Sequence, residues 1–76
     1  MLKIKDNVDL KELEKFGFKL NYDEEYEIRI EKNNVFTIIV IKHDNTVYIQ
    51  SNSYVIKELD LLFDLIKAGL IEKVGN

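Results

Sequence analysis

The middle of the chain alternates between apolar and polar residues with a period of two, which is typical of β-strands. Residues 25–31 alternate cleanly and predict a half-buried strand. Residues 35–41 are apolar everywhere except at Thr37, which favours a central strand with both faces at least partly covered. Residues 46–50 alternate again, and short segments rich in Asn and Asp separate the three strands as turns. We therefore predict a three-stranded antiparallel β-meander, to which residues 18–20 would add a short fourth strand.

A short helix is predicted before the meander. Leu10, Leu13 and Phe16 are spaced three residues apart, so they share one face of a helix. Asp9 is placed to accept hydrogen bonds from the amides of the first turn, and Gly17 can adopt the left-handed conformation that ends a helix. Because a helix of about two turns is not stable alone in water, we expect it to pack on the sheet.

A longer helix is predicted after the meander, because apolar residues recur there at intervals of three and four. Residues 51–53 are candidate N-caps, and Gly69 would end the helix with Leu70 folding back on Leu65. Residues 70–74 would form a last strand or an extended tail. The apolar stripe that we expect to pack on the sheet, with Phe63 in the core, is Val55, Ile56, Leu59, Leu62, Phe63 and Ile66.

The lengths of the two turns decide which apolar residues share a face of the sheet. A three-residue turn at residues 32–34 would pair Ile28 with Ile38, and a two-residue turn at residues 44–45 would carry the same apolar surface into the third strand. A first turn shorter by one residue would pair Ile28 with Ile39 and split that surface. We therefore predict the three-residue turn, with both helices covering one continuous apolar face.

With this register the second face of the sheet is also partly apolar. Such a cluster facing water would be larger than the scattered apolar residues that most protein surfaces carry. Leu2 and Ile4, the tail at residues 70–74, a second copy of the chain or another protein would cover it. The residues of this predicted interaction face are Val35, Ile39, Ile41 and Tyr48.

The composition narrows the class of protein. The 76 residues are 46% hydrophobic and 33% charged, and the sequence has no Pro and no linker-like segment, so we predict a single compact α+β domain over residues 1–76. The absence of Cys excludes disulfides, and the net charge of −3 disfavours nucleic acid as a partner. No apolar run is long enough for a membrane helix or a signal peptide, so we expect a cytoplasmic protein without a membrane partner.

Candidate chemical groups are few. His43 and Asp44 are adjacent in a predicted turn, where they are poorly placed to share a hydrogen bond in a pocket. Ser51 and Ser53 have no nearby imidazole to activate them. The acidic residues between 23 and 31 lack a loop glycine that would let their oxygens converge on a cation. We therefore expect no catalytic, cofactor-binding or metal-binding residues, and we expect that the protein is not an enzyme.

Two resemblances bear on function. Residues 65–73 are similar to the segment that leaves the recognition helix of winged-helix transcription factors and enters the wing, which implies a nucleic-acid-binding regulator. Residues 10–18 and 60–70 resemble small uncharacterised phage and prophage proteins of AT-rich bacterial genomes, which implies an accessory role. We expect a protein-interaction module that forms a homodimer through the second sheet face, and the regulator is the alternative. The regulator would need a basic stripe built from Lys3, Lys5, Lys11, Lys15 and Lys19.

Overall fold

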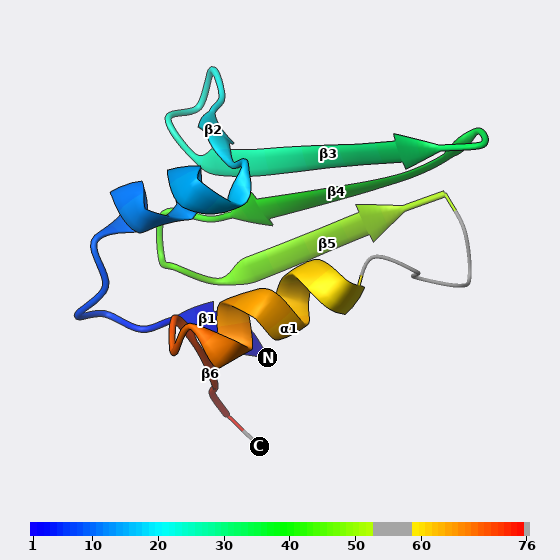
Figure 1. Cartoon of the computed structure of the whole chain (residues 1–76). Helices are drawn as coiled ribbons and strands as arrows, with labels where there is room; N and C mark the ends of the chain where they lie inside the picture. Colours follow the sequence, from blue (N-terminus) through cyan, green and yellow to red (C-terminus); the bar gives the residue numbers. More distant parts are fainter. Residues whose placement is uncertain (53–58, 76) are drawn as a thin grey trace.

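The strands form one four-stranded and one two-stranded antiparallel sheet in the computed structural model, which describes residues 1–52 and 59–75. The large sheet has the strand order β2-β3-β4-β5, and β1 pairs with β6 in the small sheet (Figure 1). The α+β class and the antiparallel meander are confirmed, and the short fourth strand is present as β2. The elements are β1 Leu2–Ile4, the helix η1 Leu10–Phe16, β2 Lys19–Leu20, β3 Tyr26–Lys32, β4 Val35–Ile41, β5 Val47–Ser51, α1 Leu59–Lys67 and β6 Ile71–Lys73.

The first helix, η1, is a 3₁₀ helix that begins and ends where the sequence predicts. The Asp9 carboxylate accepts a hydrogen bond from the Lys11 amide at 3.0 Å. Gly17 ends the helix with a φ of +96°, and a Cβ at this position would lie 3.2 Å from Cδ1 of Ile28 on β3. The glycine thus serves both the left-handed turn and the close approach of the chain to the sheet. Leu13 on η1 is fully buried.

The end of α1 is a Schellman motif. The Leu70 amide donates to the Leu65 carbonyl at 3.1 Å, and the Gly69 amide donates to the Ile66 carbonyl at 3.0 Å. Gly69 adopts a φ of +76°, as the motif requires. The predicted return of Leu70 onto Leu65 is therefore confirmed, and the chain continues into β6, which is the predicted last strand.

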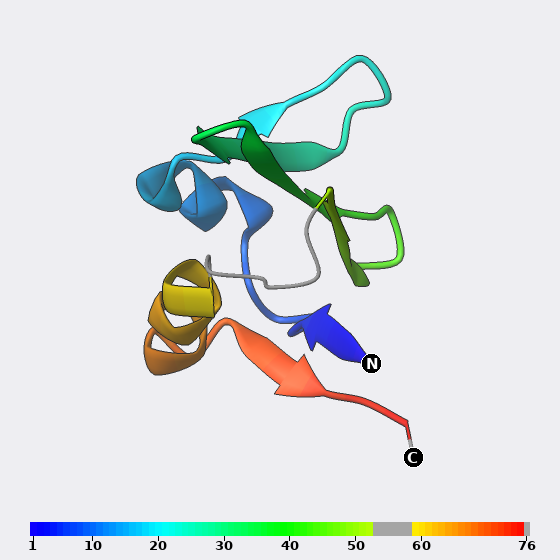
Figure 2. The same ribbon diagram turned by 90° about the vertical axis from the view of Figure 1, so that its right-hand side faces the viewer.

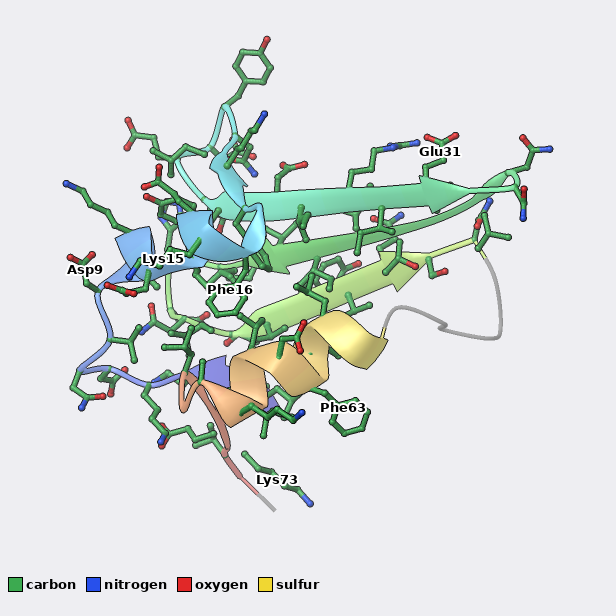
Figure 3. All side chains as sticks on the ribbon, in the orientation of Figure 1. Asp9, Lys15, Phe16, Glu31, Phe63 and Lys73 are labelled. Atoms are coloured by element: carbon green, nitrogen blue, oxygen red, sulfur yellow. The ribbon has the colours of Figure 1, made fainter. Side chains whose placement is uncertain are left out.

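The buried side of α1 differs from the predicted stripe. Leu62 and Leu65 are buried in the core, whereas Phe63 is 58% exposed and Ile66 is 48% exposed. Figure 3 shows Phe63 pointing away from the sheet. The helix carries two overlapping apolar stripes, and the return of Leu70 onto Leu65 selects the one that contains Leu65. The prediction that Phe63 belongs to the core is therefore wrong.

Two of the candidate cap residues brace the start of β4. The Asn52 side chain accepts a hydrogen bond from the Phe36 amide at 2.9 Å and donates to the Asn34 carbonyl at 2.9 Å. The Ser51 hydroxyl donates to the Phe36 carbonyl at 3.0 Å. These contacts tie the end of β5 to the β3-β4 turn. The third candidate cap and the first two residues of the predicted stripe lie outside the described residues: Ser53, Val55 and Ile56.

Both turns of the meander differ in length from the prediction by one residue. Asn33 and Asn34 alone form the β3-β4 turn with φ of +53° and +65°, so Ile28 pairs with Ile39. Two successive left-handed residues make the turn whose twist matches that of the flanking strands, and Asn tolerates this conformation. The β4-β5 turn is one residue longer than predicted, and Ile39 pairs with Ile49. The predicted register is therefore wrong at both turns, and every residue of β4 faces the side opposite to the predicted one.

The two helices lie on the same side of the large sheet, which we call the inner face (Figure 2). β4 contributes Thr37, Ile39 and Ile41 to this face, and all three are buried. The small sheet closes the core next to β5, where Lys3 bridges to Thr46. The buried apolar residues form one cluster: Ile4, Leu13, Phe18, Tyr26, Ile39, Ile41, Leu62, Leu65, Leu70 and Ile71.

Candidate interaction surface

The outer face of the large sheet, opposite the two helices, carries alternate residues of β3, β4 and β5. Its apolar residues form a strip along β4 that continues onto β5, because Val40 pairs directly with Tyr48. The Tyr48 side chain is 52% exposed, and Ile38 and Val40 are half-buried. Cross-strand pairs share a face, which defines the outer face as Glu27, Arg29, Glu31, Phe36, Ile38, Val40, Tyr48 and Gln50.

The four residues predicted to form the interaction face do not share one surface. Tyr48 lies on the outer face. Ile39 and Ile41 lie on the inner face and are buried to 1% and 2% exposure. Val35 also lies on the inner side, but it stands at the hairpin end of β4 and is exposed. Because the β3-β4 turn is one residue shorter than predicted, the outer positions of β4 are occupied by Phe36, Ile38 and Val40.

Charged side chains from β3 border the apolar strip. The Arg29 guanidinium lies 4.9 Å from the centre of the Phe36 ring, which is a cation–π contact. Its Nε is 3.5 Å from Oε2 of Glu31 on the same strand. Lys19 on β2 pairs with Glu27 on β3, so a lysine is added to the same face. The outer face therefore combines an apolar strip with charges of both signs.

A second open feature is the free part of the β3 edge. β2 pairs only with Tyr26 and Glu27 of β3. The chain before β2 comes from η1, which ends at Gly17, and does not follow the β3 edge any further. Where β2 ends, an open pocket of about 820 Å³ lies against β3. Leu20 and Tyr22 at this place are exposed to solvent. The pocket is lined by Gly17, Lys19, Leu20, Asn21, Tyr22, Glu27, Ile28 and Arg29.

A buried carboxylate ties two turns of the meander together. Glu25 accepts hydrogen bonds from Nζ of Lys42 at 3.4 Å and from the His43 amide at 3.1 Å. Nε2 of His43 lies 2.8 Å from the Asp23 carbonyl oxygen and 3.7 Å from Glu25 Oε2. The burial of Glu25 was not predicted from the sequence. These contacts join the turn before β3 to the turn after β4, which is a structural role.

Two groups have shifted pKa values with clear causes. Hydrogen bonding from the Thr46 side chain and amide lowers the pKa of Asp44, whose Oδ1 lies 3.0 Å from the Thr46 nitrogen. Burial raises the pKa of Tyr26, and the Glu14 carboxylate, which accepts the Tyr26 hydroxyl hydrogen at 3.2 Å, raises it further. Asp44 therefore stabilises its own turn, while Tyr26 links β3 to η1.

The nucleic-acid-binding alternative depends on the segment after α1 and on five lysines, all of which the structure describes. The segment after α1 forms β6, which pairs antiparallel with β1. Of the five lysines in the basic stripe that the regulator would need, Lys15 is ion-paired with Glu12 at 2.8 Å and Lys3 with Asp6 at 3.4 Å. Pairing with neighbouring carboxylates reduces the positive potential that phosphates would need. These contacts do not favour nucleic-acid binding over protein binding.

Within the described residues, no helix has both the length and the apolar character needed to cross a membrane. A comparison with protein-family models finds no match, and searches of the curated proteins and of the solved structures find none either.

Proposed function

We propose that this chain is a small phage-like accessory protein that acts in the cytoplasm as a protein-interaction module and forms a weak homodimer through its outer sheet face. The observation that carries the proposal is the apolar strip of Phe36, Ile38, Val40 and Tyr48 on the face opposite both helices. The resemblance of residues 10–18 and 60–70 to phage proteins supports the accessory role.

The charges beside the strip support a second copy as the partner. Glu27 and Glu31 flank Arg29 along β3, and Lys19 lies opposite Glu27 on β2. Both signs therefore lie on one face, so a two-fold axis can place a positive group of one copy near a negative group of the other. A face carrying one sign only would repel its own copy.

The area of the face predicts a weak contact. Three strands of five to seven residues, at the usual spacing and rise, present roughly 300 Å² of sheet surface. Stable interfaces bury about 800 Å² on each partner. We therefore expect a dissociation constant in the micromolar range or weaker, with exchange between monomer and dimer in solution.

Sedimentation from micromolar to millimolar concentration tests this proposal. Val40→Glu places a carboxylate in the strip, directly opposite Glu27 and Tyr48, where association would leave it desolvated and unpaired. We expect the variant to keep its fold and to show a lower average mass than the wild type at the highest concentration.

Val35→Glu is the matched control, because it also replaces an apolar residue of β4 with Glu, but at an exposed position on the inner side of the strand. We expect it to sediment as the wild type does. The proposal is wrong if Val40→Glu and the wild type sediment alike at every concentration.

A further inference from the structure

The free part of the β3 edge runs from Ile28 to Lys32, beyond the two residues that pair with β2. Among the described residues, no other strand pairs with this stretch. Figure 1 shows β3 extending past β2 towards the hairpin end, and Figure 3 shows Glu31 along this edge. An unpaired edge of this kind is a template for another strand.

The backbone groups that point out of the free edge belong to Arg29 and Glu31. The Glu25 carbonyl accepts from the Asn21 amide at 2.9 Å, so residue 25 directs its backbone groups towards the β2 side. Backbone groups alternate in direction along a strand, so residues 27, 29 and 31 point the same way. The two-residue turn agrees with this phase, because its closing pair Lys32–Val35 is hydrogen-bonded and directs the even-numbered residues towards β4.

We propose that the free edge of β3 pairs antiparallel with the same edge of a second copy, about a two-fold axis at Ile30. In this register Arg29 of each copy lies opposite Glu31 of the other. Each pair exchanges two backbone hydrogen bonds, so all four outward N–H groups and all four outward C=O groups of the two copies are satisfied. Each pair also places opposite charges side by side on the outer face.

Charge selects this register over its neighbours. We consider only pairings that keep the inner faces of both copies on the same side of the sheet. In such a pairing one residue of β3 lies directly opposite its own copy, and the two-fold axis passes between the two. An axis at Arg29 would place two guanidinium groups opposite each other, and an axis at Glu31 would place two carboxylates opposite each other. Like charges in directly opposed positions destabilise a sheet. The axis at Ile30 is the arrangement in which the charged side chains attract.

The paired stretch ends where β2 begins. In this register Lys32 of the second copy is opposite Ile28, directly before the Lys19–Glu27 pair, so the Asn33–Asn34 turn of that copy has to lead towards its own β4 at this point. The open pocket of about 820 Å³, which Lys19, Glu27 and Arg29 help to line, borders this place. Edge pairing uses neither Ile38 nor Val40, so it does not depend on binding at the outer face. It joins two four-stranded sheets into one continuous sheet.

Amide hydrogen exchange at increasing protein concentration tests the edge pairing. In the monomer the amides of Ile28 and Ile30 point to β4 and are protected at every concentration, while those of Arg29 and Glu31 face solvent. We expect protection of the Arg29 and Glu31 amides to rise with concentration. Unchanged exchange of these two amides up to millimolar concentration would overturn the proposal.

A charge exchange separates this register from other contacts. Arg29→Glu places like charges in both pairs and is expected to weaken the pairing roughly tenfold or more. The double variant Arg29→Glu/Glu31→Arg restores opposite charges and is expected to restore the concentration-dependent protection. Val40→Glu, which disrupts the outer face and lies opposite neither Arg29 nor Glu31, should leave that protection unchanged. A double variant as weak as Arg29→Glu would contradict the register.

A single cysteine gives a direct readout, because the chain contains no other cysteine. At the two-fold axis the two copies of residue 30 are directly opposed, at a Cα separation of about 4.5 Å that a disulfide can span. Ile30→Cys is expected to form a covalent dimer on mild oxidation, and Tyr22→Cys, which is fully exposed, is the control. Equal yields from both variants would show random collision and would overturn the proposal.

Discussion

Both faces of the large sheet carry apolar residues of β4, and they differ in what covers these residues. Ile38 and Ile39 are neighbours of the same residue type in the same strand. Ile39 is 1% exposed beneath the helices, whereas Ile38 is half-buried on the outer face. The two side chains have the same hydrophobicity, so their different exposure comes from the elements that pack on each face.

The largest expected effect is on the free energy of unfolding, when Glu replaces each of the two isoleucines in turn. Ile39→Glu would bury a carboxylate in the core without a partner, and we expect it to unfold the domain. Ile38→Glu leaves its carboxylate in water, and we expect a loss below about 1 kcal/mol. Circular dichroism and urea denaturation of both variants measure this. Equal losses for the two variants would mean that the faces are not different.

The same contrast within α1 predicts the next largest effect. Leu65→Ala empties a fully buried position and should cost about 2–5 kcal/mol of unfolding free energy. Phe63→Ala removes a larger side chain that is mostly exposed, and we expect a loss below about 1 kcal/mol. Denaturant titration of the two variants checks the order. A larger loss from Phe63→Ala would place the buried stripe of α1 where the sequence analysis put it.

The β3-β4 turn determines which residues of β4 face the helices. Asn34 has a φ of +65°, a conformation that costs an ordinary residue about 1–2 kcal/mol. We expect Asn34→Ala to lower the unfolding free energy by about 1 kcal/mol, whereas Asn34→Gly, which adopts this conformation freely, should cause no loss. Denaturation midpoints of the two variants give the comparison. No difference between Ala and Gly would contradict the two-residue turn.

The smallest effect concerns pH at the inner face. Burial and the Glu14 carboxylate raise the pKa of Tyr26, so the folded protein resists its ionisation more than the unfolded chain does. This contribution to stability is complete below the unfolded tyrosine pKa of about 10 and is lost as pH rises through the folded pKa. We expect Tyr26→Phe to lose less stability than the wild type between about pH 8 and pH 11. Urea midpoints across this range measure the difference, and parallel curves would count against it.

The element types were predictable because each has a local signal. Asp9 and Gly17 mark the ends of η1, Gly69 and Leu70 mark the end of α1, and the alternation in β3 indicates a strand. These signals depend on backbone conformations that a few neighbouring residues determine. The fold class and the meander therefore follow from the sequence.

The register and the outer face were not predictable in the same way. β4 is apolar at six of its seven positions, so no alternation indicates which side is covered. The two-residue turn, which the sequence argument rejected, divides the apolar residues of β4 between the two faces. The structure has this turn, with Thr37 buried on the inner face and Ile38 half-buried on the outer face. The signal that could have found the turn was the Asn33–Asn34 pair, since two adjacent Asn favour successive left-handed residues.

A dilution series followed by the methyl signals of β4 tests most directly that the outer face is a contact surface. Residues 38–41 all carry methyl groups and alternate between the faces, with Ile38 and Val40 outside and Ile39 and Ile41 inside. From micromolar to millimolar concentration we expect the signals of Ile38 and Val40 to shift and those of Ile39 and Ile41 to stay in place. Shifts confined to the inner pair, or no shift at any concentration, would contradict the account.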